Sequence, residues 1–407
     1  MPNIERVAII GAGNMGSGIA QKSSQENFEV EMIDIEKKWV ENGLKTIDNF
    51  LEEAEERRIF SSDQVKSIKN RITGKVGTEN ISTDVDLVIE AVFEDLSVKS
   101  NVFTTLDKVC KSDTILASNT SSLSINDLAG HVGRPDRFVG LHFFYHPAKN
   151  RLIEIIPAKE TSNETLSAVE QYCKIMGKVI IICKDRPGFV VNRFFVPWLT
   201  ESCRLLEEGI GTTSQIDLVA RETFQIGLGP FALMNLTGSP IALHSTEYLA
   251  KQLGVERFKA PNNLKEIVND GNDWQIELEP DRNEKSANII RERLLGQIFT
   301  VSAQIVEEEI CSLEDVDRGA KIGLRWSKGP FELVNEIGIS ESIRMANNYC
   351  KLSGLTLPTW FSNLDSKIPI SYVDVSINNE IAYVNINRPE AMNALNLELV
   401  NQLEKTI

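Results

Sequence analysis

His142 and Glu154 are the side chains of this sequence best suited to moving a proton. His142 lies in the strand-like segment Leu141-His142-Phe143-Phe144, and Glu154 lies in the next such segment, 12 residues further on (154 − 142). A carbon that loses hydride next to a hydroxyl needs a base for the hydroxyl proton, and histidine serves near neutral pH. A carboxylate on the second ring nitrogen would fix the tautomer and stabilise the imidazolium. From spacing alone, a core histidine with a surface glutamate is the favoured interpretation.

A glycine-rich turn provides a second constellation. Gly11-Ala12-Gly13-Asn14-Met15-Gly16 directly follows the apolar run Val7–Ile10 and opens a helix-like stretch. In a strand–turn–helix unit, Gly11 would permit the tight turn, and Gly13 would let backbone N–H groups approach a pyrophosphate. Gly16 would let the helix pack closely on the strand. The N-terminus of that helix then offers unpaired N–H groups to the phosphates.

Asp34 completes this motif. A second strand-like run, Val30–Ile33, ends at Asp34, 18 residues after Gly16 (34 − 16), close to the spacing of about 20 that dinucleotide sites have. A carboxylate here would accept hydrogen bonds from an adenosine ribose and would repel a 2′-phosphate. The order of the elements therefore predicts NAD rather than NADP. The competing interpretation is an ordinary strand–helix turn with three glycines.

A polar run follows another predicted strand. Ser118-Asn119-Thr120-Ser121-Ser122 comes directly after Thr114–Ala117. Ligands of open parallel sheets bind at the strand ends, so these hydroxyl and amide groups are candidates for contacts with nicotinamide and substrate. The alternative is the N-cap of the next helix, supplied by Ser122 or Ser124.

The composition sets limits on partners and compartment. The chain has 407 residues, of which 42% are hydrophobic and 25% are charged, as is ordinary for a soluble globular protein. A formal net charge of −15 argues against nucleic acid or membrane as a partner, but not against a phosphorylated ligand. The six cysteines form no Cys-x-x-Cys pair, so neither a disulfide framework nor a metal site is expected, and a reducing cytoplasm fits. No apolar run reaches the ~18 residues of a membrane span, and the first strand begins too near Met1 for a signal peptide.

A sheet must position these side chains, and residues 6–183 provide one. Strand-like and helix-like segments alternate there, which predicts a mostly parallel sheet covered on both faces. Residues 37–71 are charged and periodic, and predict a helical hairpin after the second strand, with solvated charges or, alternatively, a clamp over a large ligand. The strands are predicted at Val7–Ile10, Val30–Ile33, Asp86–Ala91, Thr114–Ala117, Phe138–Phe143, Leu152–Pro157 and Val179–Cys183.

After residues 184–189 the pattern changes to helices that repeat at an offset of 100 residues. Glycine, proline and charged positions stay in register without an insertion, which predicts two helical domains of one type. The segment Asp270–Ser286, rich in Asp, Asn and Glu, is the predicted linker between them. The matching positions are Arg193 and Arg293, Glu208 and Glu308, Asp217 and Asp317, Gly229–Phe231 and Gly329–Phe331, Asn235 and Asn335, and Gly238 and Gly338.

A third change comes near Ile370. Tyr372–Ile377 and Ile381–Ile386 alternate like two strands, Asn378-Asn379-Glu380 predicts the turn between them, and Ala391–Ile407 predicts an amphipathic helix. One hairpin and one helix are too short to bury a core of their own.

The glycine-rich turn, the polar run after residue 117 and the segment around His142 resemble motifs of the (S)-3-hydroxyacyl-CoA dehydrogenase family, and the resemblance covers about residues 5–365. The resemblance implies a Rossmann-like α/β domain that binds NAD, followed by two all-α repeats. It also implies reversible oxidation of a (S)-3-hydroxyacyl-CoA to the 3-oxoacyl-CoA, as in fatty-acid β-oxidation or a related short-chain pathway. The tail, with Asn387-Arg388-Pro389 and Met392-Asn393-Ala394-Leu395, is similar to the start of the enoyl-CoA hydratase (crotonase) family, so the chain looks like the front of a dehydrogenase–hydratase fusion. The dehydrogenase motifs are Gly11–Gly16, Val92-Phe93-Glu94, Ser118–Ser122, His142-Phe143-Phe144 and Asp185–Arg193.

The resemblance implies a role for each matching position. His142 would be the catalytic acid–base and Glu154 its orienting carboxylate, while Ser121 and Asn192 would contact the 3-oxygen and the acyl-CoA. The chain departs from the family at Tyr145-His146, where asparagine and proline are usual; Tyr145 is a bulkier donor, and His146 is a second candidate base. The NAD site would be lined by Gly11, Gly13, Asn14, Met15, Gly16, Asp34, Val92, Glu94, Lys99, Asn119 and Ser121.

The domains are predicted at residues 1–184 for NAD binding, 185–275 and 286–366 for the helical repeats, and 370–407 for an α+β crotonase-like stub. Two other functions suit this fold: a sugar-acid dehydrogenase of the gulonate type, and an NAD-binding structural protein impaired at Tyr145. The hydratase-like tail favours CoA chemistry over the sugar acid. The two repeats are expected to pack on each other as a pseudo-dimer, which would let the chain work as a monomer on its acyl-CoA substrate.

Overall fold

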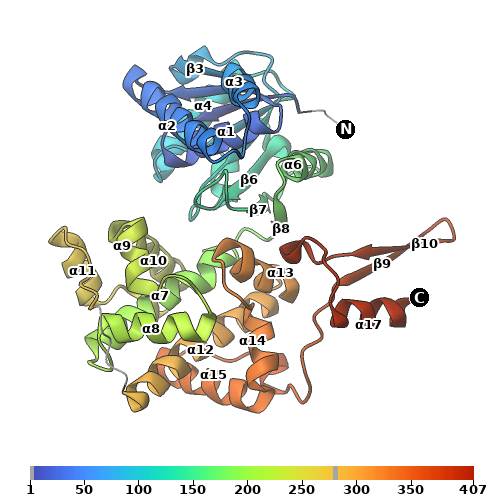
Figure 1. Cartoon of the computed structure of the whole chain (residues 1–407). Coiled ribbons are helices and arrows are strands. Elements are labelled where there is room, and N and C mark those ends of the chain that lie inside the picture. The colour runs from blue at the N-terminus through green and yellow to red at the C-terminus, as the bar shows by residue number, and fades with distance from the viewer. Residues whose placement is uncertain (1–3, 278–282) are drawn as a thin grey trace. The chain divides into compact units, whose positions relative to one another are not determined.

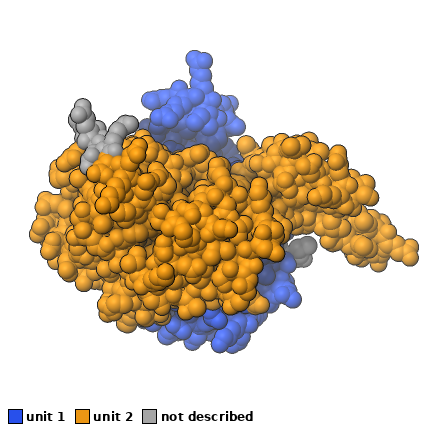
Figure 2. All heavy atoms as spheres, turned by 90° about the horizontal axis from the view of Figure 1, so that it is seen from below, with its two compact units in different colours: residues 1–189 blue, residues 190–407 orange. Residues whose placement is uncertain are grey.

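A computed structural model describes residues 4–277 and 283–407 (Figure 1). The chain divides after Phe189 into two compact units, the second running from Val190 to Ile407 (Figure 2). The glycine-rich turn, His142 and Glu154 all belong to the first unit. Within the described residues, no helix is long and apolar enough to cross a lipid bilayer.

In the described part of the first unit, eight strands form one sheet in the order β3-β2-β1-β4-β5-β6-β7-β8 (Figure 1). Neighbouring strands are parallel except β6 and β7, which are antiparallel, so the predicted mostly parallel sheet is confirmed. The strands are β1 (Arg6–Ile10), β2 (Glu29–Asp34), β3 (Ile72–Val76), β4 (Leu87–Glu90), β5 (Ile115–Ser118), β6 (Phe138–Phe143), β7 (Leu152–Pro157) and β8 (Val179–Ile182).

The edge strand β3 is missing from the sequence-based prediction. Its sequence, Ile-Thr-Gly-Lys-Val, has no buried residue, and it pairs with β2 alone. An edge strand needs no continuous apolar run, so hydrophobic periodicity gives little signal for it. Several predicted strand boundaries shift by one residue. β1 starts one residue earlier, β2 is one residue longer at both ends, and β4 is one residue shorter at both ends. β5 starts and ends one residue later, and β8 ends before Cys183.

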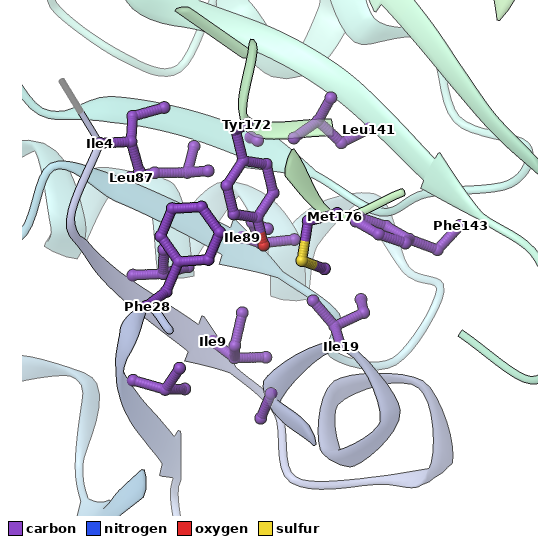
Figure 3. Packing of buried hydrophobic residues seen from close by; sticks show 14 of the residues in the cluster. Ile4, Ile9, Ile19, Phe28, Leu87, Ile89, Leu141, Phe143, Tyr172 and Met176 are labelled. Atoms are coloured by element: carbon purple, nitrogen blue, oxygen red, sulfur yellow. The ribbon is translucent and has the colours of Figure 1, made fainter. Parts of the chain in front are cut away.

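Helices pack on this sheet around one apolar core. Figure 3 shows Phe28 beside Tyr172, with ring centroids 4.9 Å apart, and Ile9 of β1 and Ile19 of α1 in the same cluster. The predicted helical hairpin is confirmed as α2 and α3, and Ser61 begins α3 in a capping box with Gln64. The elements are α1 (Asn14–Gln25), α2 (Lys37–Glu56), α3 (Ser62–Asn70), α4 (Leu96–Val109), α5 (Ile125–Ala129) and α6 (Asn163–Ile175), with short turns η1 (Thr78–Asn80) and η2 (Pro135–Arg137).

The second unit consists mainly of helices. The predicted linker Asp270–Ser286 is too long at its end, because Asn283 caps a helix that starts at Glu284; residues 278–282 lie outside the described residues. The elements are α7 (Val191–Glu207), α8 (Thr213–Phe224), α9 (Pro230–Thr237), α10 (Ser239–Leu253), η3 (Glu256–Phe258), α11 (Asn262–Asn269), α12 (Glu284–Glu307), α13 (Leu313–Arg318), η4 (Gly319–Gly323), α14 (Pro330–Ile337), α15 (Ile339–Ser353) and α16 (Thr359–Ser362).

The repeat at an offset of 100 residues is reproduced contact by contact. Asp217 accepts a hydrogen bond from the N–H of Phe231 at 2.8 Å, and Asp317 accepts one from the N–H of Phe331 at 2.7 Å. Gly229 precedes α9 and Gly329 precedes α14. A Cβ on either glycine would lie within 2.5 Å of the aspartate of its own copy. Equivalent residues therefore perform the same structural task in both copies, which confirms the predicted internal repeat.

The two copies pack on each other with reciprocal ion pairs. Arg193 of the first copy contacts Glu308 of the second at 2.5 Å, and Arg293 of the second contacts Glu208 of the first. Helix α7 lies against α12, its counterpart. Such exchange of equivalent partners is typical of an isologous dimer interface, here formed within one chain.

The tail forms a hairpin and a helix. β9 (Val373–Asn378) pairs with β10 (Ile381–Ile386) in antiparallel fashion, after which come η5 (Pro389–Ala391) and α17 (Leu397–Thr406). The predicted helix from Ala391 starts too early, because Met392 and Asn393 have positive φ values of 52° and 57° and Asn396 caps the helix instead. The first strand likewise begins at Val373 instead of Tyr372.

Candidate active site

The glycine-rich turn has two structural glycines and one open one. Gly11 has a φ of 105°, and a Cβ there would lie 2.5 Å from the carbonyl oxygen of Ala91. A Cβ on Gly16 would lie 1.8 Å from the carbonyl oxygen of Gly11. A Cβ on Gly13 would meet nothing within 4 Å. The outer glycines are therefore required by the protein itself, whereas the middle one leaves space for a ligand.

The N-terminus of α1 fits a pyrophosphate. Gly13 is its N-cap, no side chain caps it, and its first turn carries no acidic residue. Its backbone N–H groups and the positive end of the helix dipole are thus available to an anion. Of the next two residues predicted to bind the cofactor, Asn14 is exposed and Met15 packs against the core.

Asp34 lies at the end of β2 and holds the glycine-rich turn. Its Oδ2 accepts a hydrogen bond from the N–H of Ala12 at 2.7 Å, and its Oδ1 accepts one from the N–H of Ile35 at 2.7 Å. The residue remains partly exposed. A carboxylate oxygen can accept more than one hydrogen bond, so Asp34 keeps acceptor capacity for a ribose hydroxyl.

His142 and Glu154 are direct cross-strand neighbours on β6 and β7. The Nδ1 of His142 lies 2.6 Å from the Oε2 of Glu154, and the glutamate side chain is completely buried. A carboxylate accepts at Nδ1, so the neutral imidazole carries its proton there and presents the lone pair of Nε2. The interpretation of Glu154 as a surface glutamate is therefore wrong, because its side chain is buried beside His142. The two side chains form an oriented acid–base pair.

Aromatic rings and an amide fix the surroundings of His142. Its ring centroid lies 4.5 Å from that of Phe144 and 5.9 Å from that of Phe189. Asn119, at the end of β5, accepts a hydrogen bond from the N–H of Phe143 at 2.8 Å. Asn119 thereby ties the predicted nicotinamide-side loop to the strand that carries the histidine.

His146 is placed differently. Its ring packs edge-on against Phe50 of α2, with centroids 4.5 Å apart, and its Nδ1 is buried without a hydrogen-bond partner. Burial, reinforced by Lys149, lowers the pKa of His146 below its ordinary value. No carboxylate supports it, which makes it the weaker candidate base. Its neighbour Tyr145 is 64% exposed and free to meet a ligand.

Glu94 organises the polar run after β5. Its Oε1 accepts hydrogen bonds from the N–H of Ser121 at 3.0 Å and from the hydroxyls of Thr120 and Ser122 at 2.6 and 2.8 Å. Burial alone would raise the pKa of Glu94, but Lys99 and these hydroxyls outweigh it, so the pKa lies below its usual value. Glu94 is therefore ionised and holds the loop that contains Ser121.

Lys99 is buried beneath this loop, with 1% of its side chain exposed. Its Nζ lies 2.6 Å from Glu90 and 3.2 Å from Glu94. The Glu90 carboxyl also accepts hydrogen bonds from the N–H of Val92 and the hydroxyl of Ser118, both at 2.7 Å. Lys99 thus contacts Glu94, which in turn holds the loop that contains Ser121. Sequence reasoning missed Glu90, although an acidic residue closing an apolar strand was a usable signal.

A second missed residue, Lys178, holds the loop between β6 and β7. Its Nζ donates to the carbonyl oxygens of Pro147 at 2.5 Å and Asn150 at 2.6 Å. Burial, with Lys22 nearby, lowers the pKa of Lys178 to about 8. A lone lysine before a strand gives no sequence signal for such a contact, because its partners are backbone carbonyls 28 and 31 residues away.

The remaining predicted positions divide between the units. Ser124 caps α5, which decides between the two serines proposed for that role, and its hydroxyl also donates to Asp185 at 2.8 Å. Asn192 is the second residue of α7 and belongs to the second unit, so its part in the site stays a prediction. Within the described residues, no cluster of histidine, cysteine and carboxylate side chains could hold a metal ion.

Two family descriptions match almost the whole of this architecture. "3-hydroxyacyl-CoA dehydrogenase, NAD binding domain" matches residues 6–186, and "3-hydroxyacyl-CoA dehydrogenase, C-terminal domain" matches residues 188–273 and 290–359. The chain belongs to the 3-hydroxyacyl-CoA dehydrogenase family. It is an NAD-dependent enzyme that oxidises 3-hydroxyacyl-CoA, and the sugar-acid and structural alternatives are not favoured.

Individual relatives agree with this assignment. A probable 3-hydroxybutyryl-CoA dehydrogenase of Bacillus subtilis is 36% identical over 268 residues, which are 66% of this chain and 93% of that protein. The structure of the (S)-3-hydroxybutyryl-CoA dehydrogenase PaaH1 from Ralstonia eutropha has 33% identity and a TM-score of 0.63, covering 66% of this chain and 95% of that one. The Escherichia coli 3-hydroxybutyryl-CoA dehydrogenase shares the fold over 88% of this chain and 98% of its own, with a TM-score of 0.81 at 22% identity.

A longer relative matches both helical repeats. The fatty acid oxidation complex subunit alpha of Vibrio vulnificus is 31% identical over 379 residues, which are 86% of this chain. This chain spans about half, 53%, of that relative's length.

Proposed function

We propose that this 3-hydroxyacyl-CoA dehydrogenase uses His142 as its acid–base and Glu154 as the carboxylate that orients it. The observation that carries the proposal is the 2.6 Å contact between Nδ1 and the buried Oε2. With Nδ1 protonated toward Glu154, the Nε2 of His142 accepts the hydroxyl proton of the substrate, and the carboxylate stabilises the imidazolium. In the reverse direction, the imidazolium returns the proton to the 3-oxygen. NAD, when bound, supplies the acceptor for the hydride from C3.

The cofactor is proposed to bind across the carboxyl ends of β1, β4 and β5. The open position at Gly13 and the uncapped start of α1 support pyrophosphate binding there, and the partly exposed Asp34 suits the adenosine ribose. Val92, Asn119 and Ser121 are the proposed contacts on the nicotinamide side. Glu94 and Lys99 support this loop from below.

The proposed substrate is a (S)-3-hydroxyacyl-CoA with a short acyl chain, in β-oxidation or a related pathway. The B. subtilis and R. eutropha relatives, named for 3-hydroxybutyryl-CoA, support the short chain. Ser121 and Asn192 are the proposed contacts to the 3-oxygen and the acyl-CoA. Tyr145, exposed beside the histidine strand, takes the place of the asparagine that is usual in the family.

The test is the reduction of acetoacetyl-CoA by the full chain, followed as loss of NADH absorbance. We expect saturable, enzyme-dependent turnover that falls by at least about tenfold when NADPH replaces NADH. L-gulonate with NAD serves as the control substrate and should give no turnover. Turnover of gulonate with none of acetoacetyl-CoA would overturn the proposal.

Three further assignments belong to this proposal. The tail from residue 370 is similar to the start of the crotonase family, and we expect no hydration of crotonyl-CoA by this chain. The net charge of −15 and the scattered cysteines support a cytoplasmic enzyme without nucleic-acid partners. The reciprocal ion pairs between the helical repeats support a monomer.

A further inference from the structure

At two equivalent positions, the second helical repeat has a charged side chain and the first repeat has an uncharged one. At an offset of 100 residues, Arg318 and Glu332 replace Leu218 and Ala232. Asp217 and Asp317 make the same hydrogen bonds in the two copies, although the second copy has α13 followed by the π-helical segment η4 where the first has the single helix α8. Within the second repeat, Arg318 pairs with Asp315 at 2.9 Å, and Glu332 pairs with Lys321 at 2.6 Å. Glu332 also accepts a hydrogen bond from the N–H of Gly329 at 3.0 Å at the start of α14. The first repeat forms without these charges, and in the second repeat they make further contacts outside the repeat.

Both of these charged side chains contact the tail. The Nη2 of Arg318 donates to the carbonyl oxygen of Asn387 at 2.9 Å, at the end of β10. Glu332 accepts a hydrogen bond from the hydroxyl of Tyr372 at 3.3 Å, just before β9. A neighbouring residue, Glu314, accepts a hydrogen bond from the N–H of Ser371 at 3.0 Å.

Glu390 is a tail residue that lies beside charged side chains of the second repeat. It lies in η5, and only 5% of its side chain is exposed, although the preceding hairpin β9–β10 is largely exposed. Three cations surround its carboxylate: Arg318 at 3.7 Å, Lys321 at 3.6 Å and Arg388 at 4.0 Å. A buried carboxylate without cations is strongly disfavoured, so Glu390 is stable in this place only while the tail lies on the second repeat.

We propose that the second repeat is a docking platform for the tail, residues 370–407, and that Glu390 is the group it recognises. The complementary charges of Arg318 and Lys321 on the platform and Glu390 on the tail select this occupant. The first repeat cannot take it, because Leu218 and Ala232 offer neither the donor for Asn387 nor the acceptor for Tyr372. The platform holds the hairpin, whose apolar side chains Val375 and Ile377 are 53% and 76% exposed, in one orientation.

The test uses the full chain and hydrogen–deuterium exchange of the amides in β9 and β10. An isolated two-stranded hairpin is marginal in water, so a hairpin released from its platform exchanges faster. We expect Arg318→Leu, which installs the residue of the first repeat, and Glu390→Gln each to raise these exchange rates by about tenfold or more. The double variant should raise them little beyond the single variants, because the two side chains act through one contact.

The matched control is Glu380→Gln, which removes the same charge from the exposed turn of the same hairpin. Its exchange rates should equal those of the wild type. Reduction of acetoacetyl-CoA should be unchanged in all variants. If Arg318→Leu fails to fold, Glu390→Gln alone decides. Exchange in Glu390→Gln equal to that in Glu380→Gln would overturn the proposal.

Discussion

One buried carboxylate separates the two candidate bases of this enzyme. Glu154 binds His142 across the β6–β7 pair, whereas His146 packs on Phe50 with an unpaired Nδ1 and a lowered pKa. A general base gains from a partner that stabilises its protonated form, and His142 has one. The pair of His142 and Glu154 inside the sheet is therefore the proposed acid–base of the hydride transfer.

Asp34 should set the choice of cofactor. Its charge disfavours a 2′-phosphate, while its Oδ2 also accepts from Ala12. Asp34→Asn removes the charge and keeps an oxygen for Ala12, so the glycine-rich turn should survive. We expect its preference for NADH over NADPH to fall by about tenfold or more in fluorescence titrations. Equal affinity of the wild type for both cofactors would refute this role.

Lys178 should make stability depend on alkaline pH. Its pKa is about 8 in the folded chain against an ordinary 10.5, so between these values the unfolded chain binds a proton that the folded chain has lost. The contribution of Lys178 to the free energy of unfolding therefore rises with pH in this window, by about 2 kcal/mol at about pH 9.5, and is constant below pH 8. In urea unfolding, the free energy of the wild type minus that of Lys178→Met should rise by this amount, because the other titrating groups are common to both proteins. Parallel pH profiles would contradict it.

At the scale of elements, the glycines in the turn between β1 and α1 have different tasks. Gly11 and Gly16 face backbone atoms of the protein, whereas the space above Gly13 is open. The turn thus contains, within six residues, glycines required by the protein's own packing and an open position proposed for the cofactor.

Two alanine substitutions should separate these tasks. Gly13→Ala should change the free energy of unfolding by no more than about 1 kcal/mol, since its Cβ meets nothing, and should weaken NADH binding by about tenfold or more. Gly16→Ala should lower the free energy of unfolding by several kcal/mol, because its Cβ would overlap the carbonyl of Gly11. Thermal unfolding with and without NADH measures both. Undiminished NADH binding by Gly13→Ala would show that the open space is not the phosphate site.

The sequence predicted those elements whose pattern is strong. Phe138–Phe143 and Leu152–Pro157 are apolar runs that are interrupted by His142 and by Glu154, and their pairing brings these two side chains together as expected. The edge strand β3 escaped because it buries no residue and needs no apolar run. Lys178 escaped because its partners are backbone carbonyls of a distant loop, and a single charged residue has no periodicity to reveal such a contact. Glu90 was overlooked although it closes an apolar strand, which is a usable signal.

At the scale of the molecule, the helical repeats pack as an internal dimer. Because the copies are joined in one chain, weakening their contact should lower stability without changing the mass. Glu308→Gln, which breaks the pair between the exposed Glu308 and the buried Arg193, should reduce the free energy of unfolding by about 1 kcal/mol. Glu336→Gln, which breaks the exposed pair with Lys328, should cost no more than about 0.5 kcal/mol. Light scattering should report a monomer throughout.

Activity on dilution tests the same account. A monomer with its own second repeat should keep its specific activity at low nanomolar concentration. An obligate dimer whose activity is lost on dilution would show that the internal contact does not replace a subunit interface.

The central claim is that His142 performs the proton transfer of a 3-hydroxyacyl-CoA dehydrogenase. The most direct measurement is the steady-state reduction of acetoacetyl-CoA by NADH in the wild type, His142→Ala and His146→Ala, together with NADH binding. We predict that His142→Ala lowers turnover by about 10²–10⁴-fold with NADH binding retained, and that His146→Ala stays within about tenfold of the wild type. Near wild-type turnover by His142→Ala would contradict the account.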